Sequence, residues 1–157
     1  METLELDGRR FNVARANESD IPALAALLAD DVLGCKREST DLERYAVAFQ
    51  EIDRDPNHLL VAVRDAEDNL VGTMQLTLIP GLTRNGAKRL QIEGVRLASG
   101  TRGTGLGTAL FEWAHEYGHR HGATLVQLTT DKTRTDAHRF YDRLGYQATH
   151  EGYKRPL

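Results

Sequence analysis

The sequence predicts an α/β (α+β) protein, in which helices cover one mixed sheet. The main observation is that segments with strand and helix periodicity follow one another in the order β-α-α-β-β-β-α-β-α-β. The second is size: 157 residues, 40% of them hydrophobic, suit one domain with a sizeable core. We therefore expect a single domain over residues 1–157.

Composition excludes several classes of protein. The only cysteine, Cys35, cannot form an internal disulfide, which fits a reducing cytoplasm. The opening residues, METLELDGRR, are acidic and polar, unlike a signal peptide. No apolar run approaches the roughly 20 residues that span a bilayer. We expect a cytoplasmic protein that has no membrane partner.

Charge is distributed unevenly along the chain. Residues 1–83 hold 8 Lys+Arg and 16 Asp+Glu, a net charge of −8, whereas residues 84–157 hold 12 and 7, a net charge of +5. Scattered surface charge is one interpretation. The other is that the first segment meets a cation and the second meets an anion.

The first half of the chain contains one strand and two helices. Residues 11–16 alternate like a strand. Ser19 can cap a helix with Pro22 in its first turn. A second helix is expected to start at Thr40 with a capping box and to end before Pro56. The expected apolar residues are Ile21, Leu24, Leu27 and Leu28 of the first helix and Leu42, Tyr45, Phe49 and Ile52 of the second.

The rest of the chain contains the remaining strands and helices. Strands are expected at residues 58–64 and 70–79, with a hairpin loop between them, and at 88–98 and 124–130. A long helix is expected at about 105–121. A shorter helix at 135–144 is stopped by Gly145, and a last strand is placed in residues 146–155.

The letters HEYGH at residues 115–119 match the H-E-x-x-H motif of zinc hydrolases. On a helical wheel the apolar stripe is Leu106, Leu110, Ala114, Tyr117 and His121, so His115 and His119 should face solvent. A catalytic zinc also needs a third ligand, and no downstream residue is an obvious one. We interpret HEYGH as a chance match and expect no metal.

A glycine-rich segment between a strand and the long helix carries the stronger signal. Residues 102–107 read RGTGLG, with glycines at alternate positions. Without Cβ atoms the backbone can approach a ligand closely, and a helix N-terminus attracts anions. Arg102 can add an ionic contact. A phosphate or pyrophosphate ligand is expected, and a plain glycine turn is the alternative.

Two common phosphate motifs do not fit this segment. A dinucleotide fingerprint that starts at Gly103 needs glycine where Thr108 stands. A nucleotide P-loop needs Gly-Lys-Ser/Thr, and Gly107-Thr108-Ala109 lacks the lysine. Neither a dinucleotide nor a nucleoside triphosphate is therefore the expected ligand.

Arg-x-x-Gly-x-Gly before a helix, followed by AHRFYDRLGY at residues 137–146, resembles the GNAT superfamily of N-acetyltransferases. The likeness covers nearly the whole chain and implies a GNAT-like mixed, mostly antiparallel six- to seven-stranded sheet flanked by about four helices. It also implies acetyl-CoA as co-substrate. The residues after 135 are similar to bacterial small-amine acetyltransferases, among them aminoalkylphosphonate N-acetyltransferases.

The resemblance assigns roles to individual residues. Val95, Arg96 and Leu97 would pair by backbone with the pantetheine arm. The pyrophosphate would be wrapped by Arg102, Gly103, Thr104, Gly105, Leu106, Gly107 and Thr108. Glu93 matches a glutamate that serves as base, and Tyr141 matches a tyrosine near the coenzyme sulfur. Arg134 stands where the family often has asparagine, and it could reach a coenzyme phosphate instead, as could Lys132.

The implied chemistry is direct transfer of an acetyl group to a primary amine. An alkyl amine has a pKa near ~10.4, so a base must remove a proton before attack. Glu93 is the candidate, with a structural carboxylate as the alternative. Tyr141 can protonate the leaving thiolate, unless it is a core aromatic. Cys35 has no recognisable activating partner, which argues against a covalent acyl-enzyme.

Two other functions remain as alternatives. A non-catalytic acyl-CoA-binding regulatory module would keep the glycine loop without a working base. A nucleic-acid partner is not expected, because the basic segment lacks a Lys/Arg stripe with interleaved aromatics. Among enzymes, a small-molecule amine acceptor is favoured over a protein amine. The acidic first segment favours polyamine-like or aminoglycoside-like cations slightly over phosphonates. The alternative is that Lys36, Arg37 and Arg84 bind the acidic group of a phosphonate locally. A homodimer is possible, since the family often forms one.

Overall fold

The computed structural model describes residues 1–30 and 41–157. These residues form two compact units, Met1–Gln127 and Leu128–Leu157, and each is described by itself. Cys35 and Thr40 lie outside the described residues, as do the charged residues between 31 and 38. The single domain over residues 1–157 stays a prediction.

A six-stranded sheet forms the first unit, in the order β1-β2-β3-β4-β5-β6. Neighbours from β1 to β5 pair antiparallel. Thr124 N donates to Lys88 O, and the Gln127 side chain contacts Arg89 and Gln91, so β6 advances in the same direction as β5. The predicted mixed, mostly antiparallel sheet is confirmed. The strands are β1 (Glu2–Leu6), β2 (Arg9–Arg15), β3 (His58–Arg64), β4 (Leu70–Pro80), β5 (Lys88–Leu97) and β6 (Leu125–Leu128).

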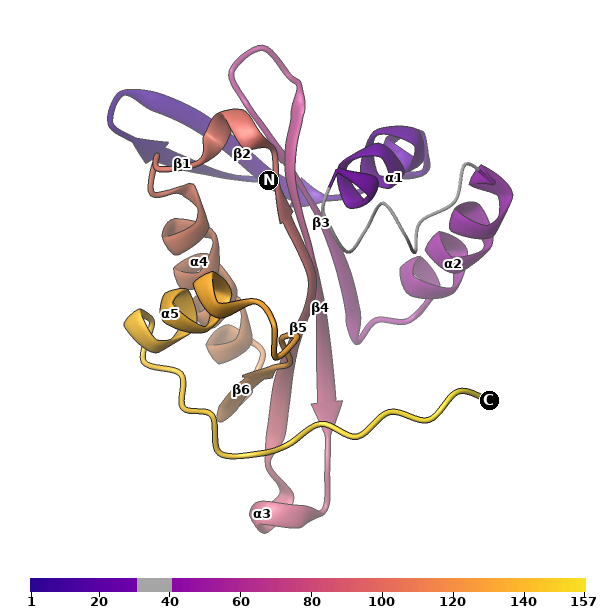
Figure 1. The fold of residues 1–157 in the computed structure, drawn as a ribbon. Coiled ribbons are helices and arrows are strands. Elements are labelled where there is room, and N and C mark those ends of the chain that lie inside the picture. Colours follow the sequence, from indigo (N-terminus) through magenta and orange to yellow (C-terminus); the bar gives the residue numbers. More distant parts are fainter. Residues whose placement is uncertain (31–40) are drawn as a thin grey trace. The chain divides into compact units, whose positions relative to one another are not determined.

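Helices cover both faces of this sheet. Figure 1 shows α4 (Leu106–Arg120) on one face and α1 (Ile21–Ala29) and α2 (Leu42–Arg54) on the other. A short turn, α3 (Thr83–Gly86), closes the β4–β5 hairpin. Together with α5 of the second unit, the three long helices match the predicted number of four. The predicted strands of the first unit agree with β2 to β6 to within a few residues.

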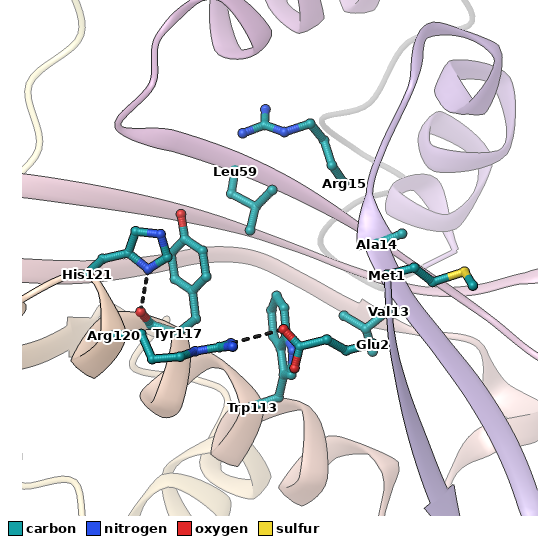
Figure 2. Close-up of a pocket in the computed structure, with 10 residues that line it drawn as sticks. All are labelled: Met1, Glu2, Val13, Ala14, Arg15, Leu59, Trp113, Tyr117, Arg120 and His121. Carbon is teal, nitrogen blue, oxygen red and sulfur yellow. Dashed lines mark hydrogen bonds and ion pairs between the residues drawn. The ribbon is translucent and has the colours of Figure 1, made fainter.

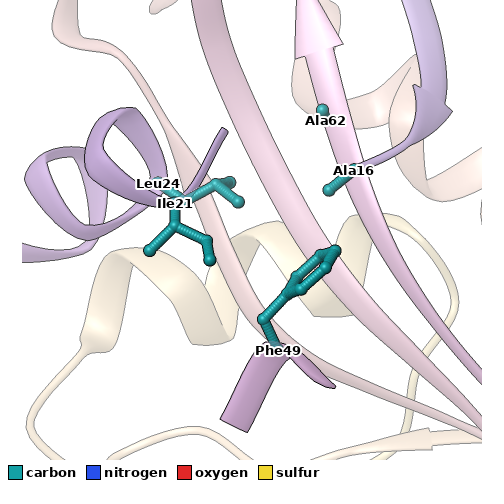
Figure 3. Packing of buried hydrophobic residues seen from close by; sticks show 5 residues of the cluster. All are labelled: Ala16, Ile21, Leu24, Phe49 and Ala62. Carbon is teal, nitrogen blue, oxygen red and sulfur yellow. The ribbon is translucent and has the colours of Figure 1, made fainter. Parts of the chain in front are cut away.

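Alternation along the strands divides the core between the two faces. On the α4 face the buried residues include Val13, Val61, Met74, Leu76, Leu90 and Ile92. On the α1–α2 face, Ile21 and Leu24 of α1 and Phe49 of α2 pack with Ala16 and Ala62 (Figure 3). Small residues in the strands therefore let the two amphipathic helices approach the sheet.

Close contact between α4 and β5 depends on Gly118. A Cβ at this position would lie 2.9 Å from Leu90 Cδ2 and 3.3 Å from Leu90 Cβ. The buried stripe of α4 is Leu106, Leu110, Phe111, Ala114 and Gly118. The predicted stripe was therefore rotated, because Tyr117 is only half-buried and His121 is exposed. Glycine has a low helix propensity, but at position 118 its missing side chain is what allows α4 to pack against β5.

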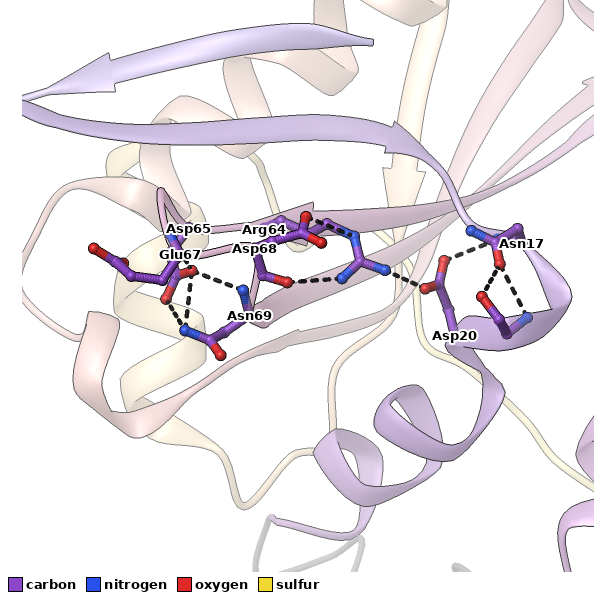
Figure 4. A network of polar contacts seen from close by, with 8 residues as sticks. Asn17, Asp20, Arg64, Asp65, Glu67, Asp68 and Asn69 are labelled. Carbon is purple, nitrogen blue, oxygen red and sulfur yellow. Dashed lines mark hydrogen bonds and ion pairs between the residues drawn. The ribbon is translucent and has the colours of Figure 1, made fainter.

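The start of α1 differs from the prediction that Ser19 caps it. Asn17 is the cap of a 3-10 turn that leads into α1: its side chain accepts from Ser19 N at 2.9 Å, and Asp20 bonds back to Asn17 N at 2.9 Å. Asp20 is buried and also pairs with Arg64, whose NH1 donates to Asp68 O (Figure 4). The turn before α1 is thus tied to the β3–β4 hairpin. Pro22 lies in the first turn, as expected.

At the start of α2 the side chain of Asp41 accepts from Glu43 N at 3.2 Å. The hairpin loop between β3 and β4 is held by Asp65, whose carboxylate accepts from the backbone and side chain of Asn69. These bonds, with that from the Asn69 side chain the largest, lower the pKa of Asp65 below its usual range. Local carboxylate caps, which are common in turns, fix both connections.

The second unit contains α5 (Thr135–Arg143), which ends at Leu144 and Gly145. Gly145 has a φ of 84°, the left-handed conformation of a glycine that follows a helix, as predicted. The prediction of a strand in residues 146–155 is wrong, because this segment has no regular secondary structure. The sequence reading also missed β1, whose five residues, ETLEL, carry only a weak alternation.

Candidate functional site

A β-bulge lies near the end of β5, where this strand pairs with β4. The register shifts between Thr73 and Gln75, so that Gly94 and Val95 together lie opposite Met74. Gly94 has a φ of 60°, in the left-handed region that favours glycine. A bulge leaves the backbone groups of one residue outside the ladder. Backbone N–H groups at this point can therefore serve a ligand.

Val95, Arg96 and Leu97 follow the bulge and are half-buried. β6 ends at Leu128, and its contacts with β5 fall between Lys88 and Gln91, so β6 does not run alongside this part of the strand. An extended ligand can pair with a strand edge of this kind. Leu97 packs over Gly72, where a Cβ would lie 2.7 Å from Leu97 Cδ2.

The glycine loop, residues 102–107, follows β5 after one tight 3-10 turn. Ala98 N donates to Val71 O at 2.8 Å, and the buried Thr101 donates through its hydroxyl to Ala98 O at 2.7 Å. Thr104 Oγ1 in turn donates to Thr101 O at 2.7 Å. A chain of backbone and hydroxyl bonds thus anchors the loop to β4 and gives it one conformation.

Within the loop, Gly103 and Gly105 have φ values of 75° and 79°. A Cβ at either position would meet no protein atom within 4 Å, so the space beside them is open. Gly105 is the N-cap of α4, and the first-turn N–H groups of Gly107 and Thr108 have no acceptor inside the helix. The helix dipole adds positive potential there. Arg102 is exposed, and its guanidinium is accessible. These residues fit a pyrophosphate.

Glu93 lies directly before the bulge, and its side chain is exposed. Its cross-strand partner is Gln75, and the next pair along the strands is Thr77 and Gln91. Because neighbours directly opposite share a face, Glu93 lies on the α1–α2 face of the sheet. The structure thus brings Glu93, residues 95–97 and the glycine loop together in the first unit, on one strand and the turn that follows it.

Tyr141 and Arg134 belong to the second unit. The half-buried ring of Tyr141 lies edge-on to that of Tyr146, with centroids 5.9 Å apart. Burial, and to a lesser degree the neighbouring Tyr141, raises the pKa of Tyr146. Arg134 is the N-cap of α5, and Lys132 lies 3.7 Å from Glu151. Their roles toward a coenzyme remain expectations from the family resemblance.

Of the two histidines of HEYGH, His119 is exposed as predicted, but His115 is half-buried beside Phe111. Burial lowers the pKa of His115, and the negative charge of Glu112 partly opposes this shift. Among residues 1–30 and 41–157, no three His, Cys, Asp or Glu side chains are grouped so that they could hold a metal ion. In the same residues, no helix is long and apolar enough to span a membrane.

A separate pocket of about 270 Å³ lies on the α4 face of the sheet. Its walls include Trp113 and Tyr117, whose rings stack, and Arg120, which donates to Glu2 at 3.0 Å (Figure 2). This bond to Arg120 holds the pKa of Glu2 below its usual range. None of the predicted site residues lines the pocket. The bond between Arg120 and Glu2 connects α4 to β1, and the pocket is not part of the site at β5.

The model of the Acetyltransferase (GNAT) family matches residues 23–146. The chain belongs to the GNAT family of acetyltransferases. A relative from Salmonella typhimurium, an aminoalkylphosphonate N-acetyltransferase, is 30% identical over 144 residues, which cover 90% of this chain and 88% of the relative. The family uses acetyl-CoA as co-substrate, and this GNAT protein is an acyltransferase.

Solved structures agree with this GNAT fold. A transcriptional regulator from Bacillus halodurans is 44% identical, with a TM-score of 0.88, and the match covers 94% of this chain and 99% of that one. A putative acetyltransferase from Agrobacterium tumefaciens has a TM-score of 0.81 at 23% identity, over 93% of this chain and 99% of that one. At that identity the likeness shows the fold alone.

The sequence reading missed the bulge at Gly94 and the hydroxyl chain of Thr101 and Thr104. One signal was present: a glycine inside the strand pattern QIEGVRL is typical of a bulge. The threonines carried no pattern of their own, because their bonds depend on a turn that brings residues three apart into contact.

Proposed function

We propose that this GNAT protein transfers the acetyl group of acetyl-CoA directly to the primary amine of a small molecule. The observation that carries the proposal is the continuity of one short segment: an exposed carboxylate, a strand bulge and a glycine loop at a helix N-terminus follow within residues 93–108. Each part supplies one requirement of acyl transfer to an amine, namely a base, donors for an oxyanion and a site for phosphate.

The glycine loop and Arg102 would hold the pyrophosphate, and Val95 to Leu97 would pair with the extended arm. Acetyl-CoA supplies the activated thioester when bound. Glu93, directly or through water, takes one proton from the ammonium so that the nitrogen can attack. The N–H groups at Gly94–Val95 then donate to the carbonyl oxygen as it gains charge.

The remaining steps balance the reaction. As the new C–N bond forms, the C–S bond breaks and the thiolate leaves. It has an intrinsic pKa of roughly 8.5 and is protonated by Tyr141 or by solvent. The nitrogen loses two protons in all: the first passes through Glu93 to solvent, and the second, lost after attack, replaces the proton that the thiolate takes up. The chain therefore needs no covalent acyl-enzyme and no metal for this reaction.

For the acceptor, two features favour a cationic small molecule. Residues 1–83 have a net charge of −8, and the proposed base, Glu93, is an exposed carboxylate. The Salmonella relative acts, by its name, on aminoalkylphosphonates, whose acidic group such a field would repel. We therefore favour polyamine-like and aminoglycoside-like amines over aminoalkylphosphonates as the acceptor.

The test is release of free thiol from acetyl-CoA while a panel of amines is screened, with product mass measured for each hit. We expect at least one small primary amine to be acetylated with stoichiometric thiol release. Acetylation of protein amines alone, with no small molecule turned over, would contradict the proposed acceptor class.

A second candidate function is a regulatory module that binds acyl-CoA, and the name of the Bacillus relative favours it. Such a module would bind acetyl-CoA but show no dependence on Glu93. Turnover of a Glu93→Gln variant separates the two functions, and salt-dependent retention on DNA checks for a nucleic-acid partner.

A further inference from the structure

Uncharged polar side chains form a continuous row beside Glu93 on the α1–α2 face of the sheet. Cross-strand pairing connects most of them. Residue 58 on β3 pairs with residue 77 on β4, which in turn pairs with residue 91 on β5. Residue 75 on β4 pairs with Glu93. All are half-buried. This set, called the polar row below, consists of His58, Gln75, Thr77, Gln91 and Gln127.

Hydrogen bonds hold the row in one arrangement. Thr77 Oγ1 lies 3.0 Å and Gln75 Nε2 lies 3.4 Å from His58 Nδ1. On the other side of the ring, His58 Nε2 lies 3.7 Å from Asp55. Each ring nitrogen of His58 therefore has a polar partner, the Thr77 hydroxyl and the Gln75 amide on one side and the Asp55 carboxylate on the other. The imidazole is thereby fixed from both sides.

The β5–β6 end of the row is fixed in the same way. Gln127 Nε2 donates to Gln91 Oε1 at 2.7 Å, and Gln127 Oε1 accepts from Arg89 NH1 at 3.3 Å. Two hydrogen bonds therefore set the orientation of both amides.

These orientations determine what the row presents to a ligand near Glu93. The Gln75 amide nitrogen is turned to His58, so its oxygen is the end that can accept from a ligand. The Gln91 oxygen accepts from Gln127, so its amide nitrogen is the end that can donate to a ligand. Cβ atoms directly opposite are about 5 Å apart, and residues two apart on a strand are about 7 Å apart. An acceptor and a donor thus lie within one small molecule's reach of Glu93.

We propose that the polar row is the floor of the acceptor site and selects a primary amine that carries hydroxyl or carbonyl oxygens close to its nitrogen. This inference rests on the proposed function and narrows its substrate class: among cationic amines it favours hydroxylated, aminoglycoside-like acceptors over plain polyamine-like ones. A hydroxyl can donate to the Gln75 oxygen and accept from the Gln91 nitrogen. An alkyl chain would remove water from these two atoms without bonding either, which is costly.

The row itself offers an acidic acceptor no charged partner. None of its five members carries a permanent charge. On β5, Arg96 shares this face, because it lies opposite Thr73, and its NH1 donates to Val95 O at 2.7 Å. Arg89, four residues from Glu93 on the other side, bonds Gln127. Both guanidinium groups therefore already have partners within the protein.

The experiment compares matched amines on matched variants. 2-Amino-1,3-propanediol and 3-aminopentane differ only in that two hydroxyls replace two methyl groups, and 2-aminoethylphosphonate serves as the acidic amine. The ratio of kcat/KM for the diol to that for the hydrocarbon is measured in wild type, in Gln75→Leu and in Gln91→Leu. Gln50→Leu, at an exposed position of α2, is the control. Because the ratio is compared between variants, intrinsic differences in amine reactivity cancel.

We expect the wild type to prefer the diol by at least tenfold, and each row variant to lose about three- to tenfold of that preference, the effect of one hydrogen bond. The rate with 3-aminopentane should be unchanged or higher in the row variants, and Gln50→Leu should behave as wild type. Unchanged Tm and acetyl-CoA affinity show that a variant is folded. Should a leucine variant unfold, Gln75→Met and Gln91→Met replace it with side chains of similar shape.

A ratio near one in the wild type, a ratio that the row variants leave intact, or a clear preference for the phosphonate would overturn the inference. Each of these outcomes still includes acetyl transfer to an amine, so the proposed function would stand. If no amine of any class is acetylated, the proposed function itself fails.

Discussion

Single residues at the end of β5 carry the chemistry proposed for this GNAT protein. Glu93 is exposed beside a bulge that frees backbone donors, and no regular strand pairing would place a base and an oxyanion site so close together. The sequence pointed to Glu93 only through the family resemblance. The bulge and the 3-10 turn between Glu93 and Arg102 determine how the chain places these two residues.

The first prediction concerns Glu93→Gln. Its turnover at neutral pH should fall by roughly 10²-fold, the usual contribution of a general base. Part of the loss should be recovered at higher pH, because more of the amine is then unprotonated. Thiol release measured between pH 6.5 and 9.5 gives the profile. Glu116→Gln, on the exposed side of α4, is the control; a Glu93→Gln profile like that of this control would assign the base to another residue.

His115 gives a second prediction at this scale, on stability. Burial beside Phe111 lowers its pKa in the folded protein, whereas in the unfolded chain a histidine titrates near ~6.5. Just below that pH the unfolded state binds more protons, so the free energy of unfolding decreases as pH falls. Tm measured at pH 7.5 and 5.5 should therefore drop less in His115→Gln than in wild type. His119→Gln, at an exposed position, should keep the wild-type drop; equal drops in all three proteins would contradict the assignment.

Among the elements, those with clear periodicity were the predictable ones. β3 was placed to the residue, and β4, β5, α4 and α5 to within a few residues, because each has a regular apolar pattern between turn signals. β1 was missed, since as an edge strand it buries little and its pattern is weak. The strand expected in residues 146–155 alternates in sequence but does not form.

Caps and packing details depended on tertiary contacts that no local pattern shows. Asn17 caps in place of Ser19 because Asp20, two residues before Pro22, is held by Arg64 from β3. The stripe of α4 was rotated because Gly118, not Tyr117, faces Leu90. Local sequence thus predicted which elements exist, and side-chain contacts between distant residues decided how they begin and pack.

The third prediction concerns the close packing of β3, β4 and β5 at Gly72. An alanine Cβ there would lie 2.7 Å from Leu97 Cδ2 and 3.1 Å from Val63 Cβ, and the latter cannot move without its strand. Gly72→Ala should therefore destabilise the protein by about 1–3 kcal/mol, the usual cost of overpacking. Chemical denaturation measures this cost. At Gly81 the nearest atom would be 3.6 Å away, so Gly81→Ala should leave stability nearly unchanged. Equal effects of the two variants would contradict the packing described for β5.

Over the whole molecule, charge separates along the chain, with −8 in residues 1–83 and +5 in residues 84–157. This asymmetry could be read from the sequence, and it agrees with a cationic acceptor and an anionic co-substrate. The comparison with the Salmonella relative does not decide between acceptors, because 30% identity leaves room for a change of substrate.

The fourth prediction follows from that field. For a hydroxylated diamine acceptor such as 1,3-diamino-2-propanol, kcat/KM should fall severalfold when NaCl is raised from about 20 to about 300 mM, because salt shortens the screening length below ~10 Å. For 2-aminoethylphosphonate it should stay constant or rise. A fall of equal size for both acceptors would show that the salt effect comes from the anionic co-substrate instead.

Binding of acetyl-CoA to two matched glycine variants tests the proposed site most directly. Gly105 and Gly122 have φ values of 79° and 76°, so leucine strains the backbone similarly at both. Of the two, Gly105 lies in the glycine loop and Gly122 follows the other end of α4. Calorimetric titration should give wild-type affinity for Gly122→Leu and at least a hundredfold weaker binding for Gly105→Leu, and ATP and NAD should bind the wild type far more weakly than acetyl-CoA does. Equal acetyl-CoA affinity in the two variants, or ATP binding as tight as acetyl-CoA binding, would contradict the assignment of the glycine loop to the pyrophosphate of acetyl-CoA.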